Sequence, residues 1–191
     1  MRKIFFDIET RNSFEEAGSG EPSALDLSVV CIYDSETGKY TSYLQEELKN
    51  LWPIIEKADM LIGFNTEHFD IPILNKYYSG DLTKIKSLDL LKEIKSSLGR
   101  RLKLDGVAEA TLGKNKSGHG MEAIIWWNEG KIDEIIKYCK EDVKITKEIY
   151  EYALANKHLK YKDNGEIKKI PLDTSKWEEK DASAMTFTLP F

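Results

Sequence analysis

Two patterns of hydrophobic residues alternate along the chain, and together they predict an alternation of strands and helices. Short apolar runs rich in β-branched and aromatic residues, bounded by turn residues, predict strands. Longer stretches with apolar residues three and four apart predict amphipathic helices, most clearly over 133–155. The predicted strands are 3–9, 27–33, 39–44, 60–64 and 85–90. The predicted helices are 46–58, 67–78, 90–98, 106–112, 121–128 and 133–155.

The order of these elements predicts the fold class. A turn over 34–38 joins the second and third strands, so the chain begins with three antiparallel strands. Strands and helices then alternate, which predicts an α/β protein with a mixed central sheet in a three-layer arrangement. Residues 11–25 are polar and contain glycine, which predicts a loop, and Pro53 predicts an interruption of helix 46–58. In this fold the end of the first strand lies near the centre of the sheet.

The length of the chain suits one such domain with a full hydrophobic core. The chain has 191 residues, of which 41% are hydrophobic and 32% are charged. We expect the domain to span 1–156 and a C-terminal extension to span 157–191. An Asn-Gly pair at Asn164 and Gly165, between alternating residues, predicts a small hairpin in that extension.

Cysteine usage and hydropathy predict a cytoplasmic protein with no membrane segment. Cys31 and Cys139 both fall in apolar segments, as buried thiols do in a reducing compartment. No apolar run approaches the ~20 residues that cross a bilayer. The net charge of −5 argues against broad binding of nucleic acids. That argument weakens if several acids are clustered on metal ions, which invert the local field.

The first strand ends in two acids that share one face. Side chains alternate along a strand, so Asp7 and Glu9 point the same way. Like charges this close repel each other, and taking them out of water costs on the order of several kcal/mol per ion. A divalent cation between the two groups offsets this cost. The pair therefore predicts a metal site at the end of the strand.

A second acidic segment lies at the junction of a predicted strand and helix. Asp70 falls in the first turn of helix 67–78, where Asn65 or Thr66 is expected to be the cap. Each residue also has a purely structural explanation. Phe69 is explained as a core aromatic residue, and Asp70 by attraction to the positive end of the helix dipole.

The third segment lies on the longest predicted helix. Tyr138 and Asp142 are four residues apart and therefore share a face, close to the apolar stripe of the helix. Asp142 is then partly inward-facing, which is unusual for an acid that has no partner. A hydrogen bond between Tyr138 and Asp142 at a helix boundary is the alternative explanation.

Together the three segments resemble the tyrosine-type DEDD (DEDDy) 3′–5′ exonuclease superfamily, which has a ribonuclease H-like fold. Its first motif, Asp-x-Glu, matches Asp7 to Glu9; its second, Asn-x-x-x-Phe/Tyr-Asp, matches residues 65–70; its third, Tyr-x-x-x-Asp, matches residues 138–142. A histidine-type member would carry histidine where this chain has Lys137. The resemblance covers roughly residues 2–154. Residues 104–120 are similar to predicted bacterial and archaeal exonucleases related to the proofreading domains of family B DNA polymerases.

The resemblance implies hydrolysis of phosphodiester bonds with two divalent cations, Mg²⁺ or Mn²⁺, about 4 Å apart. Asp7 would bridge both ions. Glu9 and Asp142 would complete the site of the ion that carries the attacking water, and Asp70 would hold the second ion, largely through water. Tyr138 would orient the attacking water, since a phenol with a pKa of about 10 is a poor base.

The same resemblance implies contacts with the substrate. Thr10 would meet the terminal nucleotide, and Asn65 and Phe69 would contact its sugar or stack near its base. Lys114 and His119 lie in a stretch rich in Gly, Ser and Lys that the superfamily places near the nucleic acid, although a solvated loop explains them equally simply. The basic run over 100–103 could likewise contact the phosphate backbone of a nucleic acid or form a solvated surface.

These residues predict a metal-dependent 3′–5′ exonuclease. It would act on single-stranded or frayed ends of DNA or RNA and release nucleoside 5′-monophosphates. A non-catalytic nucleic-acid-binding domain and a ribonuclease H-type endonuclease are the alternatives, because both would keep the fold. The four carboxylates and the tyrosine favour an enzyme, and the motifs around Asn65 and Tyr138 favour an exonuclease. A polymerase, a helicase or another nucleic-acid-processing protein is the partner expected in trans.

Overall fold

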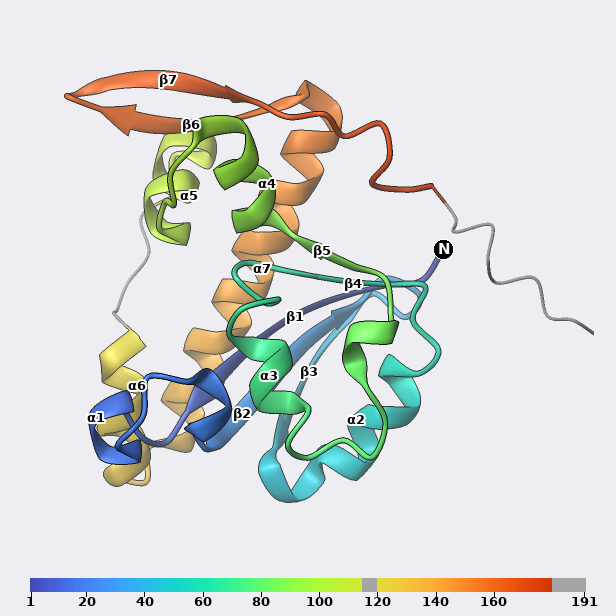
Figure 1. Cartoon of the computed structure of the whole chain (residues 1–191), viewed down its shortest axis with the longest axis vertical. Helices are drawn as coiled ribbons and strands as arrows, with labels where there is room; N and C mark the ends of the chain where they lie inside the picture. Colours follow the sequence, from blue (N-terminus) through green and yellow to red (C-terminus); the bar gives the residue numbers. More distant parts are fainter. Residues whose placement is uncertain (115–119, 180–191) are drawn as a thin grey trace, which may run out of the picture.

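A five-stranded mixed sheet forms the centre of the molecule (Figure 1). The computed structural model describes residues 1–114 and 120–179. The strand order is β3-β2-β1-β4-β5, with β1 antiparallel to β2 and parallel to β4. The strands are β1 (Lys3–Thr10), β2 (Leu27–Asp34), β3 (Lys39–Leu44), β4 (Met60–Gly63), β5 (Ser87–Asp89), β6 (His158–Asp163) and β7 (Glu166–Pro171). The α-helices are α1 (Phe14–Ala17), α2 (Leu48–Ile55), α3 (Asp70–Leu74), α4 (Leu90–Leu98), α5 (Leu104–Leu112), α6 (Gly120–Asn128) and α7 (Ile132–Asn156). Short 3₁₀ turns are η1 (Pro22–Ala24), η2 (Gln45–Glu47) and η3 (Leu82–Lys84).

The central strand β1 divides the hydrophobic core between the two faces of the sheet. Ile4, Phe6 and Ile8 point to one face, where they pack with buried residues of α2 and α3. Phe5 points to the other face and packs with buried residues of α4 and α7. Figure 1 shows α7 crossing one face of the sheet and α2 and α3 on the other. The predicted α/β fold with a mixed sheet between helical layers is therefore confirmed.

The segment before α3 differs from its prediction. The sequence predicts a helix over 67–78, whereas α3 spans Asp70–Leu74 and residues 66–69 form a turn. Neither Asn65 nor Thr66 caps α3, so that prediction is wrong. Asn65 instead adopts a left-handed backbone conformation with φ of 72°. The reason is a contact from another element: the carboxylate of Asp89 accepts the backbone N–H groups of Asn65 and Glu67 and holds them outside the helix.

Two further differences concern segments at the periphery of the sheet. Helix α2 continues through Pro53, so the predicted interruption is wrong; Leu51 and Ile55 are buried on either side of the proline and hold the turn against the core. Residues 11–25 contain α1 and η1 rather than an unstructured loop. Ser13 and Glu16 form a reciprocal capping box, which stabilises the short helix α1.

Strands β6 and β7 form a hairpin that packs against the body of the molecule. Asn164 and Gly165 occupy its turn with φ of 50° and 88°, the left-handed conformation that a two-residue turn of this kind requires. Leu159 and Ile170 are fully buried in the same hydrophobic cluster as residues of the sheet and of α7. Among the described helices, none has the length and apolar character needed to cross a membrane.

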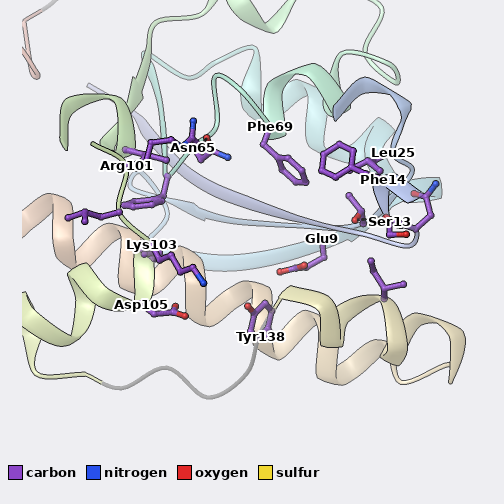
Figure 2. A pocket seen from close by; sticks show the side chains of 17 residues that line it. Glu9, Ser13, Phe14, Leu25, Asn65, Phe69, Arg101, Lys103, Asp105 and Tyr138 are labelled. Atoms are coloured by element: carbon purple, nitrogen blue, oxygen red, sulfur yellow. Dashed lines mark hydrogen bonds between the residues drawn. The ribbon is translucent and has the colours of Figure 1, made fainter. Parts of the chain in front are cut away.

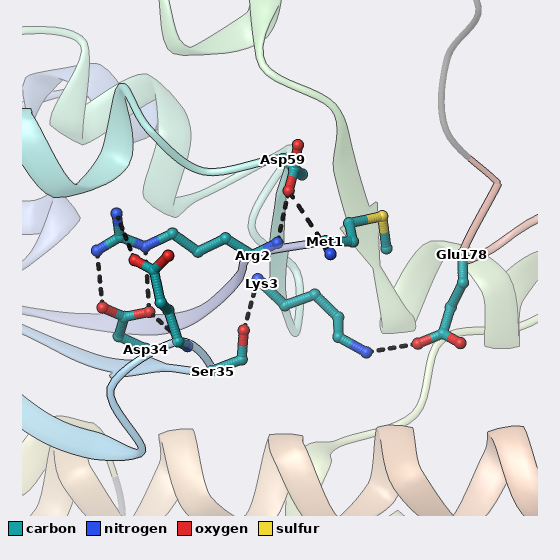
Figure 3. A network of polar contacts seen from close by, with 8 residues as sticks. Met1, Arg2, Lys3, Asp34, Ser35, Asp59 and Glu178 are labelled. Atoms are coloured by element: carbon teal, nitrogen blue, oxygen red, sulfur yellow. Dashed lines mark hydrogen bonds and ion pairs between the residues drawn. The ribbon is translucent and has the colours of Figure 1, made fainter.

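Ion pairs fix the start of β1 to the rest of the sheet (Figure 3). The Arg2 guanidinium binds Asp34 through two contacts, Nη2 to Oδ2 at 2.7 Å and Nε to Oδ1 at 3.2 Å. Lys3 pairs with Glu178 near the C-terminal end of the described chain. Asp34 is only 5% exposed. Burial alone would raise the pKa of Asp34, but the Arg2 contacts outweigh it and hold that pKa below its usual value.

The variant Asp34→Asn should lose stability at neutral pH and much less in acid. Because the pKa of Asp34 is lowered in the folded state, the stabilisation is present above the unfolded pKa of about 3.9 and is lost as the pH falls through the folded pKa. We expect the free energy of unfolding to fall by about 1–3 kcal/mol at neutral pH. Urea unfolding across a pH series measures this, with the exposed Asp133→Asn as control. A loss independent of pH would contradict the assignment.

Candidate metal-binding and catalytic site

Three carboxylates from β1 and α7 come together on one face of the sheet. Asp7 and Glu9 lie on the face of β1 that carries Phe5, which is the face that α7 covers. Asp142 approaches them from α7. Ligand oxygens of Asp7, Glu9 and Asp142 all lie within 4.8 Å of one another. Glu9 is 9% and Asp142 5% exposed, and Asp7 is half-buried, so this carboxylate cluster is largely shielded from bulk water.

The two cysteines hold α7 against the strands that carry the site. The Cys139 thiol donates to the backbone oxygen of Asp7 at 3.3 Å, and the Cys31 thiol to that of Ile136 at 3.7 Å. Both cysteines are free and fully buried, and burial raises the pKa of Cys139 well above its usual value. The Cys139 thiol therefore remains neutral, and both cysteines act as packing and hydrogen-bonding groups.

Asp70 lies beside this cluster as the first residue of α3, and it is 3% exposed. Burial, with the negative charges of Asp89 and Asp142, raises the pKa of Asp70 to about 8. The backbone N–H of Ile8 favours the ionised form of Asp70 and so offsets part of this shift in pKa. Oδ1 of Asp70 is buried without a hydrogen-bond partner among the described residues.

The donor set of the site fits a divalent cation. An orphaned, buried carboxylate oxygen beside three clustered carboxylates is costly in a dry protein, because each charge lacks solvation and repels its neighbours. Hard cations such as Mg²⁺ and Mn²⁺ bind oxygen ligands of this kind. Asp7, Glu9 and Asp142 together, with Asp70 beside them, could therefore hold such ions.

Asp89 supports the site, and our sequence reasoning did not find it. Its carboxylate accepts backbone N–H groups of Asn65 at 2.8 Å, Glu67 at 3.1 Å and Leu91 at 2.9 Å. It thus caps α4 and, with the same group, fixes the turn that leads to Asp70. An aspartate directly before helix 90–98 is a sequence signal for a helix cap, whereas nothing in the sequence indicates its bonds to residues 65–67.

A cavity of about 810 Å³ opens onto the carboxylate cluster. Glu9 belongs both to the cluster and to the cavity lining, so the two are continuous. Figure 2 shows Glu9 on the floor, Phe69 and Phe14 on one wall, and Tyr138 of α7 opposite. The rings of Phe14 and Phe69 meet edge to face with centroids 6.3 Å apart. The wall is therefore aromatic and lies directly above an acidic floor.

Most of the predicted substrate contacts line this cavity. Thr10, Asn65 and Phe69 all do so. Lys114 does not: it pairs with Glu148 on α7, outside the lining. His119 lies outside the described residues.

One lining residue, Phe14, was absent from the predicted substrate contacts. It lies in the segment predicted to be a loop, and no pattern near it pointed to Phe69. The basic run over 100–103, for which contact with nucleic acid was one of two explanations, contributes Arg101 and Lys103 to the lining, and Arg101 donates to the side-chain oxygen of Asn65. Arg100 instead turns toward the β6–β7 hairpin, where it pairs with Asp163.

Comparison with known proteins agrees with this geometry. A family model of the RNase H superfamily matches residues 4–154, which is most of the chain. The chain belongs to the RNase H superfamily. The match includes every carboxylate of the site and Tyr138, consistent with the three motifs of the DEDD exonucleases. A search of curated proteins finds no match.

Solved structures show the same fold in a larger protein. The family B DNA polymerase from the hyperthermophilic archaeon Pyrobaculum calidifontis superposes with a TM-score of 0.63 at 19% sequence identity. The alignment covers 81% of this RNase H-superfamily chain and 24% of the polymerase chain. At this identity the likeness supports the fold, and this chain spans only about a quarter of the length of that polymerase.

Replacement of Asp89 by alanine should destabilise the protein and loosen the turn before Asp70. The change leaves the N–H groups of Asn65, Glu67 and Leu91 without their acceptor, so we expect the free energy of unfolding to fall by about 2–4 kcal/mol. Asp89→Asn keeps an acceptor oxygen and should lose less. Asp81→Ala, which removes an exposed cap of η3, is the matched control. Equal losses for Asp81→Ala and Asp89→Ala would contradict this role.

Asp70→Asn should make the metal-free protein more stable. The amide removes a buried charge that Asp89 and Asp142 repel, so in EDTA at about pH 9 its Tm should exceed that of the wild type. The gain should shrink as the pH falls below 8 and vanish near the unfolded pKa of about 3.9. Added Mn²⁺ should raise the Tm of the wild type more than that of the variant. A variant that is less stable in EDTA and gains equally from Mn²⁺ would contradict a cation site at Asp70.

Proposed function

We propose that this protein is a metal-dependent 3′–5′ exonuclease that hydrolyses single-stranded or frayed ends of DNA or RNA and releases nucleoside 5′-monophosphates. The observation that carries the proposal is the grouping of Asp7, Glu9 and Asp142 within 4.8 Å, with buried Asp70 beside them and a cavity above. The order of the three motifs along the chain adds support, since it resembles that of the tyrosine-type DEDD exonucleases.

Asp7, Glu9, Asp70 and Asp142 are the residues that would hold two divalent cations, Mg²⁺ or Mn²⁺. When bound, such ions acidify an attacking water and offset negative charge on the leaving oxygen. Glu9, Asp70 and Asp142 are buried and Asp7 is half-buried, so packing limits the reorganisation needed when the ligands engage. The Cys139 thiol contact between α7 and β1 helps to maintain the separation of Asp142 from Asp7.

Tyr138 is the residue that would orient the attacking water. Its ring is 7% exposed and meets Trp126 of α6 edge to face, with centroids 5.9 Å apart, so its position is fixed by packing. It lines the cavity one helical turn before Asp142. A phenol is a weak base, and orientation rather than proton abstraction is therefore its role.

The shape and chemistry of the cavity favour binding of the end of a nucleic-acid strand. Ser13, Phe14 and Leu25 line one end of the cavity, so a strand that enters from the other end meets this segment (Figure 2). Phe69 and Phe14 offer apolar ring surface to a terminal base, which is a sequence-tolerant contact. Arg101 and Lys103 on the opposite side would meet phosphate groups.

The decisive test is a time course on 5′-labelled single-stranded DNA and RNA with Mn²⁺ or Mg²⁺. We expect a ladder that shortens from the 3′ end and stops in EDTA. Asp142→Asn should lower kcat/KM at least about 100-fold, because a lost metal ligand costs no less than a lost group that supports one. Asp133→Asn, an exposed acid on the same helix, is the matched control and should behave as the wild type.

A substrate with a blocked 3′ end separates the proposal from its rivals. An exonuclease leaves this strand intact, whereas a ribonuclease H-type endonuclease cuts it internally. Internal cuts would overturn the exonuclease assignment. Binding of both strands without cleavage under any metal condition would favour a non-catalytic nucleic-acid-binding domain.

A further inference from the structure

The β6–β7 hairpin presents a basic outer face that the catalytic proposal does not use. Side chains alternate along each strand, so one face of the hairpin carries Leu159, Tyr161 and Ile170, which are buried. The opposite face, called the basic face below, carries Lys160, Lys162, Ile167 and Lys169. Lys162 is 59% and Ile167 64% exposed, and Lys169 is also exposed, so this face is open to solvent.

The charges on the basic face are not balanced within the hairpin. Lys160 and Lys169 lie directly opposite each other across the strands, an arrangement of like charges that destabilises a sheet. The two acids of the hairpin, Asp163 and Glu166, pair with each other in register on the other face. Asp163 already binds Lys168 at 2.7 Å, as well as Arg100.

An acid from another element compensates the charge of this face weakly. Glu109 of α5 lies 4.0 Å from Lys162, and both side chains are more than half exposed. The chain as a whole carries a net charge of −5, whereas the hairpin holds four lysines against two acids. A positive surface on an acidic protein indicates an anionic partner.

The hairpin is a rigid platform rather than a loose arm. The Thr111 hydroxyl at the end of α5 both donates to the Lys160 backbone oxygen, at 3.2 Å, and accepts from its N–H, at 3.0 Å. Leu172 N bonds to Lys157 O at 3.0 Å where the chain leaves β7. Lys160 also lies over the Tyr152 ring of α7, 5.6 Å from its centroid. The basic face is therefore fixed relative to α7, the helix that carries Asp142.

Helix α5 runs from the cavity to this platform, and Figure 1 shows α5 beneath the β6–β7 hairpin. Its first residues, Leu104 and Asp105, line the cavity, while Thr111 near its other end holds β6. The nine residues of α5 span about 14 Å. For a stacked strand with the duplex rise of about 3.4 Å per nucleotide, this corresponds to roughly four nucleotides. Arg101 and Lys103 at the cavity and the lysines of the hairpin thus lie along one side of the molecule, at the two ends of α5.

We propose that the basic face binds the phosphate backbone of a single nucleic-acid strand about four or more nucleotides upstream of the 3′ end held in the cavity. The inference rests on the proposed function for the orientation of the strand, but not for the binding itself. The lysines supply sequence-independent charge, and exposed Ile167 beside Lys162 supplies apolar contact with a base or sugar. The hairpin would therefore make long strands bind more tightly than short ones.

Fluorescence anisotropy of 5′-labelled oligothymidylates in EDTA tests this without cleavage. The double variant Lys162→Glu/Lys169→Glu should bind a 20-nucleotide strand about tenfold more weakly than the wild type at low salt. The slope of log K against log[salt] should fall by about 1.4, the value for two lost contacts with a single strand. A four-nucleotide strand, too short to reach the hairpin from the cavity, should show little difference.

The matched control is Lys49→Glu/Lys57→Glu, which reverses the charge of two exposed lysines. Lys49 lies in α2 and Lys57 follows it, on the opposite face of the sheet from α7. This control changes the net charge equally and should bind as the wild type does. Equal loss in both double variants, or no loss in the hairpin variant, would overturn the proposal, as would equal competition by polyglutamate of the same charge. Circular dichroism establishes that each variant is folded. The binding assay needs no cleavage, so the two proposals can fail separately. If the wild type cleaves no substrate but the hairpin variant still binds long strands more weakly, the nuclease assignment is overturned and the proposed binding surface is supported.

Discussion

Electrostatic repulsion among buried carboxylates is the constraint on which the architecture of this molecule depends. Asp7, Glu9 and Asp142 lie within 4.8 Å of one another, and Asp70 is buried beside them. The raised pKa of Asp70 expresses the cost directly, since burial and neighbouring charge both oppose its ionised form. Backbone N–H groups offset part of that cost, and divalent cations would offset the rest. A core that yielded easily would let the acids move apart, so the rigidity of the surrounding packing is a functional requirement.

The topology of the sheet makes this concentration of charge achievable. β1 pairs with β2 through residues 4–10 but with β4 through residues 3–5, so its C-terminal half leaves room on the β4 side. The start of α3 enters that room and places Asp70 next to the Ile8 N–H. Gly63 ends β4 where a Cβ would lie 2.1 Å from Thr66, so only glycine lets the chain turn this closely toward the site. On the other face α7 is tied to β1 through Cys139.

Separation of the two signs of charge would reconcile an acidic protein with the polyanionic substrate of the proposed function. The acids that matter for chemistry are gathered on the floor of the cavity, where bound cations would invert the local field. The lysines of the basic face lie on the hairpin, which carries none of these site acids. In the proposed function, a nucleic-acid strand would be attracted at a distance from the reacting bond and positioned by packing near it. The net charge of −5 describes neither surface, which is why it is a poor guide to the partner of this protein.

Features that depend on local periodicity could be predicted from the order of the residues. The two-residue period of a strand placed Asp7 and Glu9 on one face, the helical period placed Tyr138 one turn before Asp142, and the alternation of elements gave the layered α/β fold. Packing between distant segments sets four other features: the length of α3, the left-handed Asn65, the pairing of Phe14 with Phe69 and the double role of Asp89. These features depend on contacts between residues more than twenty positions apart, such as the 24 between Asn65 and Asp89. A periodic pattern states which side chains share a face within one element. The packing of the whole core decides which elements meet on that face. Here the backbone N–H groups of Asn65 and Glu67 bind the carboxylate of Asp89, and these bonds override the local preference for helix.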